Sequence, residues 1–145
     1  MSHSNTLSSV YMPLRITFGL VPLLAGLDKF VNVLADWEAY LPSYVADVLP
    51  FSAATFMMIV GVIEIVAGLA VLTKFTRLGA FVVMAWLVLL AIAVASAGYL
   101  DIAVRDLAMA VAAYTLGTVA GIRGEQWLPG LSHEPDEGAS HAPAH

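Results

Sequence analysis

The chain has 145 residues, of which 60% are hydrophobic and 12% charged, and its mean hydropathy is +0.86. This composition excludes an ordinary soluble domain of this size and predicts an integral membrane protein. The formal net charge of -5 and the lack of a basic tract argue against nucleic acid as a partner, and the absence of cysteine excludes disulfides, thiol chemistry and cysteine-held iron–sulfur or zinc centres.

Four apolar stretches of about 20 residues follow one another, each long enough at 1.5 Å per residue to cross a hydrocarbon core of about 30 Å. We expect an all-α fold, an integral membrane four-helix bundle that forms one domain over residues 12–123. An N-terminal tail over residues 1–11 precedes it and lacks the features of a signal peptide. The predicted membrane helices cover about residues 12–34, 51–73, 78–98 and 102–122.

The stretch between the first two spans, residues 35–50, is too short and too acidic to cross a bilayer. It carries Trp37, Tyr40 and Tyr44, and aromatic side chains of this kind favour the membrane surface. We therefore expect a short interfacial segment here.

Histidine is confined to the ends of the chain, at His3, His133, His141 and His145. The predicted spans therefore offer no histidine pair for a haem and no histidine–carboxylate set for a metal, so the chain alone should hold no redox centre. After Arg123 the composition changes to Gly, Pro, Ser, His and acidic residues, which predicts a disordered C-terminal tail over residues 124–145. Its histidines either bind a metal weakly or stay solvated, and the solvated tail is the better interpretation.

The loops predict the orientation. Lys74, Arg77 and Arg123 fall on one side of the membrane, whereas the acidic interfacial segment and Asp101 fall on the other. Positive charge favours the cytoplasmic side, so both termini are expected in the cytoplasm of a bacterial inner membrane. Asp101 is also placed to cap the fourth helix.

Charges within the spans are the candidate functional groups, because a charge near the bilayer centre costs about 3 kcal/mol on insertion scales. Glu64 is the deepest, about 18 Å from the outer end of its helix at 1.5 Å per residue. Lys29 is its first candidate partner and Arg105 its second. A shallower layer, in which two acids and two bases can neutralise one another, comprises Asp28, Lys29, Arg105 and Asp106. Arg15 shares a helix face with Lys29.

Three interpretations of these charges stay open. They form interhelical ion pairs that fix the register of the bundle, or they line a polar pocket or proton path with Glu64 at its floor, or they snorkel to head groups. Small residues recur at helical spacing, and close helix packing is a better explanation for them than space for a flat ligand. They are Gly19, Gly26, Gly61, Gly68, Gly117 and Gly121.

The order and spacing of several of these residues resemble those of the DoxX/DoxD family of small four-helix membrane proteins. This family includes the small membrane subunit of thiosulfate:quinone oxidoreductase. The resemblance covers about residues 12–122. It rests on Leu14-Arg15, Gly19, Gly26 and Lys29-Phe30 in the first span, Gly61-Val-Ile-Glu64 and Gly68-Leu69 in the second, and Arg105-Asp106-Leu107 in the fourth. It implies association with membrane oxidoreductases and the quinone pool, often beside other subunits.

From these features together we expect a small membrane subunit of a quinone-linked oxidoreductase or respiratory complex. A polar pocket near Lys29, Glu64 and Arg105 would hold a quinone or pass a proton, while electrons come from a partner subunit. Because the chain has no cysteine to hold a sulfane sulfur, any sulfur transfer would fall to that partner. The alternative is a purely structural subunit that anchors a larger complex in the bilayer. A small-molecule permease fits less well, since no inverted repeat is visible.

Overall fold

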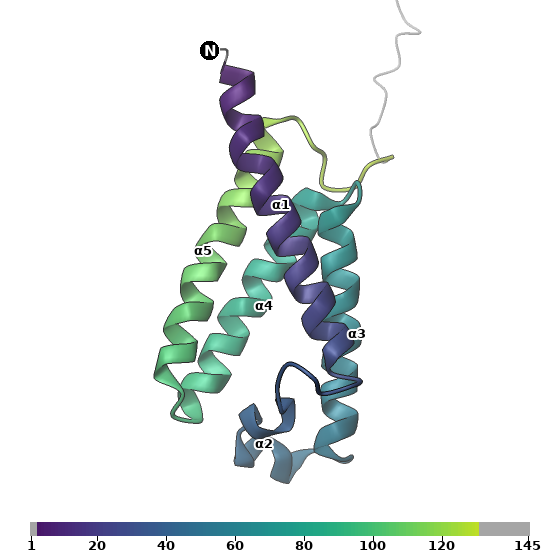
Figure 1. Ribbon diagram of the computed structural model, residues 1–145, viewed down its shortest axis with the longest axis vertical. Coiled ribbons are helices and arrows are strands. Elements are labelled where there is room, and N and C mark those ends of the chain that lie inside the picture. The colour runs from purple at the N-terminus through teal and green to yellow at the C-terminus, as the bar shows by residue number, and fades with distance from the viewer. Residues whose placement is uncertain (1–2, 131–145) are drawn as a thin grey trace, which may run out of the picture.

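The structure is a computed structural model that describes residues 3–130, and Figure 1 shows four long helices side by side. The four are long and apolar enough to cross a membrane, which confirms the expected all-α membrane bundle. The described chain begins and ends at one end of the bundle, the terminal end, and the short helices lie at the other, the capped end. In chain order the helices are α1 (His3–Asp28), η1 (Trp37–Tyr40), α2 (Ser43–Val48), α3 (Ala53–Leu72), α4 (Thr76–Ser96) and α5 (Leu100–Ile122).

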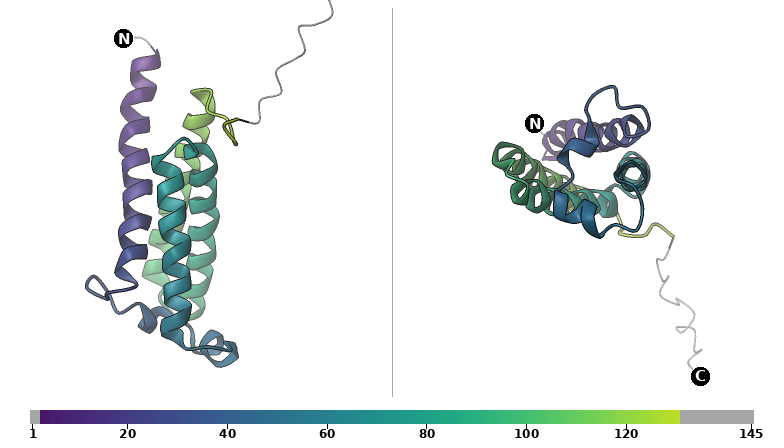
Figure 2. Two further views of the ribbon diagram at one scale, coloured as in Figure 1. Left: turned by 90° about the vertical axis from the view of Figure 1, so that its right-hand side faces the viewer. Right: turned by 90° about the horizontal axis from the view of Figure 1, so that it is seen from below.

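The bundle is built from two helix pairs, α1 with α3 and α4 with α5, and Figure 2 shows the four helices from the side and from the capped end. Glycines bring the first pair together: a Cβ added at Gly26 would lie 2.5 Å from the carbonyl oxygen of Gly61, and one added at Gly68 would lie 2.5 Å from that of Gly19. In the second pair, a Cβ at Gly117 would lie 2.6 Å from the ring of Phe81. Close backbone approach of this kind strengthens van der Waals packing, which drives helix association in lipid.

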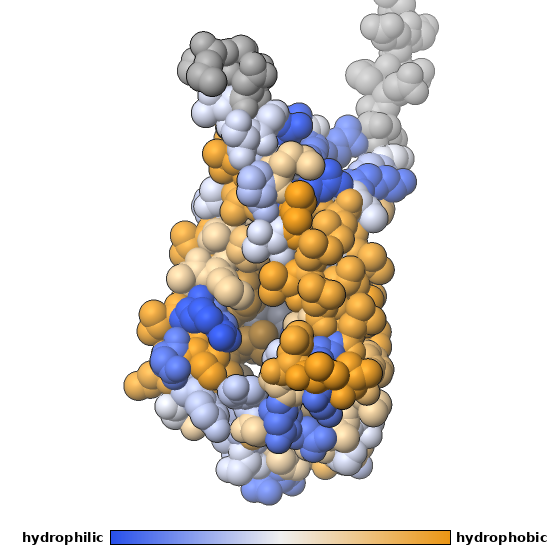
Figure 3. Space-filling model, in the orientation of Figure 1, coloured by the Kyte–Doolittle hydropathy of each residue, from blue (hydrophilic) through white to orange (hydrophobic). Residues whose placement is uncertain are grey.

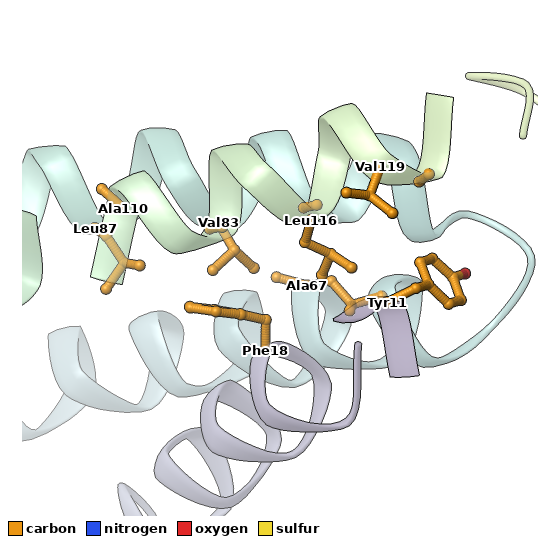
Figure 4. Close-up of a cluster of buried hydrophobic side chains, with 12 residues drawn as sticks. Tyr11, Phe18, Ala67, Val83, Leu87, Ala110, Leu116 and Val119 are labelled. Carbon is orange, nitrogen blue, oxygen red and sulfur yellow. The ribbon is translucent and has the colours of Figure 1, made fainter. Parts of the chain in front are cut away.

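The two pairs join mainly in the half of the bundle near the terminal end. There Phe18 from α1 lies close to Val83 of α4 and Leu116 of α5 in one buried cluster (Figure 4). A second cluster, nearer the capped end, contains buried residues of α4 and α5 alone, Ala91, Val94 and Ala103. Figure 3 shows that this face of the molecule is hollowed in that half, while apolar side chains cover most of the surrounding surface. The bundle is therefore tightly packed at one end and more open at the other.

The first helix differs from the prediction at both ends. It begins at His3 instead of residue 12, so the predicted N-terminal tail is wrong for residues 3–11, and residues 1 and 2 lie outside the described part. The first residues of this helix are polar, so hydropathy does not predict them as part of a membrane helix, although they belong to the same helix. It ends at Asp28 instead of residue 34, because the Asp28 carboxylate accepts the backbone N–H of Val33 and Leu34 and so holds a non-helical loop.

The interfacial segment contains η1 and α2 and lies across the capped end (Figure 2). The hydroxyl groups of Tyr44 and Ser96 are hydrogen-bonded at 2.8 Å, and the rings of Tyr40 and Tyr99 meet edge to face with centroids 5.5 Å apart. The segment thus ties the α1–α3 pair to the turn between α4 and α5. Asp101 makes no side-chain cap, because the N-cap position of α5 is Tyr99; its carboxylate lies in the first turn, where the helix dipole favours it.

Residues 124–130, directly after α5, are placed against the bundle, so the predicted disorder is wrong for them. The hydroxyl of Tyr11 donates a hydrogen bond to the carboxylate of Glu125. The centroids of the Trp127 and Phe81 rings lie 5.1 Å apart, and the guanidinium of Arg77 lies 4.3 Å from the centroid of the Trp127 ring. These contacts fasten the segment to the bundle, and the rest of the predicted tail, residues 131–145, lies outside the described residues.

Candidate functional site

The centre of the candidate site is an ion pair between Lys29, just past the end of α1, and Glu64 in the middle of α3. The Nζ atom of Lys29 lies 2.6 Å from Oε2 of Glu64, and the two side chains are only 4% and 8% exposed. Gly61 makes this possible, because a Cβ there would lie 3.1 Å from the Cβ of Lys29. Residues three apart share a helix face, so the side chain of Lys29 follows α3 from Gly61 to Glu64. The partner expected from helix depth is therefore the partner found.

Two tryptophans complete the surroundings of the pair, one on each side. The amine of Lys29 lies 3.7 Å from the ring centroid of Trp37 in η1, and a cation–π contact of this kind is worth about 2 kcal/mol when it is desolvated. The indole N–H of Trp86 in α4 donates to Oε1 of Glu64 at 3.4 Å, a long hydrogen bond. These four residues are called the Lys29–Glu64 site below.

Asp28 serves this site indirectly and does not join a charge-neutralised layer as predicted. Its carboxylate accepts the backbone N–H of Val33 at 2.9 Å and of Leu34 at 3.0 Å, and the indole N–H of Trp37 at 2.8 Å. Asn32 lies between these residues with a φ of 52°, a left-handed conformation that turns the chain back. The buried acid thus orders the loop that places Trp37 over Lys29.

Arg105 and Asp106 pair with each other on α5, where Nη2 of Arg105 lies 3.1 Å from Oδ1 of Asp106. The side chain of Arg105 is 63% exposed, whereas that of Asp106 is 7% exposed. Within residues 3–130 neither is hydrogen-bonded or ion-paired to Lys29 or Glu64. The prediction of Arg105 as the second-choice partner of Glu64 is therefore wrong.

Arg15 lies near the middle of α1, beside the end of α3 and away from the Lys29–Glu64 site. Its guanidinium donates to the carbonyl oxygens of Val71, Leu72 and Thr73 at 3.1, 2.7 and 2.8 Å. The last carbonyls of a helix lack partners within the helix, and a positive charge beside them is favourable. Arg15 therefore caps α3 from α1 and fixes the register of that pair.

Sequence reasoning missed the tryptophans as site residues. The sequence places Trp37 at the membrane surface and gives no signal for Trp86, because neither carries a charge and no periodicity distinguishes them. The one available signal was the position of Trp37 shortly after Lys29. Among the described residues no cluster of His, Cys, Asp and Glu is placed to hold a metal ion.

A family model described as DoxX matches residues 10–97, which is more than half of the chain. The match includes α1 from Val10 onward, the interfacial segment, α3 and all of α4, and therefore all four residues of the Lys29–Glu64 site. It ends before α5, so Arg105 and Asp106, which carried part of the resemblance, lie outside it. Neither a curated protein nor a solved structure matches the chain.

Proposed function

Because the chain belongs to the DoxX family of membrane proteins, we propose that it is a small membrane subunit of a quinone-linked oxidoreductase and that its Lys29–Glu64 site handles a quinone head group or its protons. The observation that carries this proposal is the buried Glu64 carboxylate, held between an ammonium and an indole N–H within an apolar bundle. A buried ion pair gives little net stability for its desolvation, so ionisable groups at such depth suggest function.

The groups of the site suit this chemistry. A bound quinone takes up two electrons and two protons to become a quinol. In this proposal the amine of Lys29 and the indole of Trp86 donate hydrogen bonds to a head-group oxygen. Glu64, protonated from water, gives one proton to the reduced quinone and takes up another from water before the second transfer, and Lys29 stabilises the carboxylate between the two transfers. Electrons come from a redox centre on a partner subunit.

In this proposal the quinone head group enters from the bilayer between the two helix pairs. The contact between Trp86 and Glu64 joins α4 to α3, at the boundary between the two helix pairs. Towards the capped end the core cluster of α4 and α5 includes no residue of α1 or α3, and the surface is hollowed on the face seen in Figure 3. A lipid-soluble head group entering between the pairs would meet the site before it met the tight core.

The same proposal includes an orientation. Arg15, Lys74, Arg77 and Arg123 all belong to the terminal end, and Asp101 lies in the first turn of α5 at the capped end. Under the positive-inside rule the terminal end faces the cytoplasm, and the capped end faces the outside of a bacterial inner membrane.

The test compares Glu64→Gln with Glu38→Gln in the assembly purified with its partner subunits. Glu38 lies in the exposed part of η1, so its substitution removes one carboxylate without touching the site. Glu64→Gln should lower quinone reduction by about 100-fold or more, because an amide cannot exchange the proton, while Glu38→Gln leaves it unchanged. Full turnover with Glu64→Gln would exclude the proton-handling role.

A second candidate, a purely structural subunit, is favoured by the glycine contact beside the pair. Gly26 and Gly61 bring the backbones of α1 and α3 together next to Lys29, so the pair also fixes the register there. If the subunit is purely structural, the complex should keep its turnover with Glu64→Gln. Turnover should fall only with Lys29→Met, in proportion to the loss of assembled complex.

A further inference from the structure

A cavity of about 340 Å³ lies at the terminal end of the bundle, where α3 ends, and away from the Lys29–Glu64 site. It opens between α1, the turn that joins α3 to α4, and the segment over residues 124–130. Small-molecule sites have volumes of about 300–1,000 Å³, so this cavity is large enough for a compact polar group. Its walls include Tyr11, Arg15, Thr73, Lys74, Thr76 and Glu125.

The walls carry opposite charges on different elements. Arg15 is fixed from α1 by three carbonyl oxygens, and Lys74 stands exposed in the turn, where no ion pair within residues 3–130 holds its amine. Glu125 belongs to the segment after α5, and the hydroxyl of Tyr11 fixes its carboxylate. The cavity therefore presents two cations from one side and a carboxylate from another.

The position of the cavity indicates its ligand. Thr73 follows the last residue of α3 and Thr76 is the first residue of α4, so the cavity lies where two apolar spans end. Lipid head groups are the charged molecules present at that depth. A phosphodiester suits paired Arg and Lys side chains, and an ammonium group suits a carboxylate.

We infer that this cavity binds the head group of an amine-bearing zwitterionic phospholipid. The phosphodiester lies towards Arg15 and Lys74, and the ammonium lies towards Glu125. The inference is independent of the quinone proposal, because it uses none of the residues of the Lys29–Glu64 site.

The experiment measures lipid binding to the full-length protein in detergent by native mass spectrometry, with dioleoyl phosphatidylethanolamine and dioleoyl phosphatidylglycerol as probes. The wild-type chain should retain phosphatidylethanolamine at lower lipid concentration than phosphatidylglycerol. Lys74→Gln should weaken both lipids about tenfold, which corresponds to one charge-assisted contact. Glu125→Gln should remove the preference and leave phosphatidylglycerol at least as tightly bound, since the amide oxygen can still accept from Tyr11.

Arg123→Gln is the matched control, because it removes the same charge from the same end of the bundle; the Arg123 guanidinium lies 4.4 Å from the centroid of the Tyr11 ring but does not itself line the cavity. It should change binding of either lipid by less than about twofold, whereas a general surface-charge effect would make it equal to Lys74→Gln. That equality would overturn the inference, as would an unchanged lipid preference with Glu125→Gln. Displacement of the lipid by equimolar glycerophosphoethanolamine or inorganic phosphate would assign the cavity to a soluble phosphate compound instead.

Discussion

Replacing Lys29 by Met tests whether the buried ion pair controls the stability of the bundle. The change leaves Glu64 without its ammonium partner, and the long hydrogen bond from Trp86 is the contact that remains. An unpaired carboxylate at this depth is a buried charge without compensation, and removing one partner of a buried ion pair costs about 3–5 kcal/mol. The loss of stability should therefore be about 3–5 kcal/mol.

The double variant Lys29→Met/Glu64→Gln should recover most of the loss, since no charge remains to be buried.

Equilibrium unfolding in detergent at pH 7 measures both variants against the wild-type chain, with Lys74→Met as the control for loss of an exposed lysine. The reasoning is refuted if Lys29→Met costs less than about 0.5 kcal/mol at pH 7, the level expected of a surface substitution. It is equally refuted if the double variant is no more stable than the single one.

Three further predictions concern the rest of the chain. Arg15→Met should destabilise the bundle by about 1–3 kcal/mol in the same unfolding assay, because the carbonyls at the end of α3 lose their donor; a neutral effect would show that water replaces the guanidinium. Truncation after Pro129 should leave the melting temperature unchanged, whereas truncation after Gly124 should lower it by several degrees because the contacts of Trp127 are lost; equal melting curves would contradict the docking of this segment. An introduced Ser43→Cys in α2 should react with an impermeant thiol reagent in intact cells, and reaction only after lysis would reverse the proposed orientation.

Hydropathy predicted the fold well because the dominant constraint on a membrane chain is the length of its apolar stretches. The predicted second, third and fourth spans differ from α3, α4 and α5 by at most two residues at each end. The pairing of Lys29 with Glu64 also followed from the sequence, since helix rise fixes depth and a buried acid requires a cation at a reachable depth. The proposed ligand and proton roles of these residues stay predictions.

The contacts that sequence reasoning missed are those made by irregular backbone and neutral side chains. Nothing in the composition after Arg123 distinguishes Trp127, which docks against Phe81, from the polar residues around it. Likewise Trp86 has the same apolar neighbours as any lipid-facing residue, and only the packing of α4 against α3 turns its indole towards Glu64. Such contacts depend on the relative rotation of helices, which periodicity does not specify when every face of a helix is apolar.

The early end of α1 links the fold to the site. Had the helix continued to residue 34 as hydropathy suggests, Trp37 would have been carried beyond the reach of Lys29 at 1.5 Å per residue. Instead the carboxylate of Asp28 accepts the N–H groups of the following loop and of the Trp37 indole, so the chain folds back over the amine that pairs with Glu64. A buried acid that makes no ion pair is therefore as important to the site as the pair itself. It turns an exposed lysine at a helix end into one that is desolvated, covered by an aromatic ring and aimed at the deepest charge in the chain.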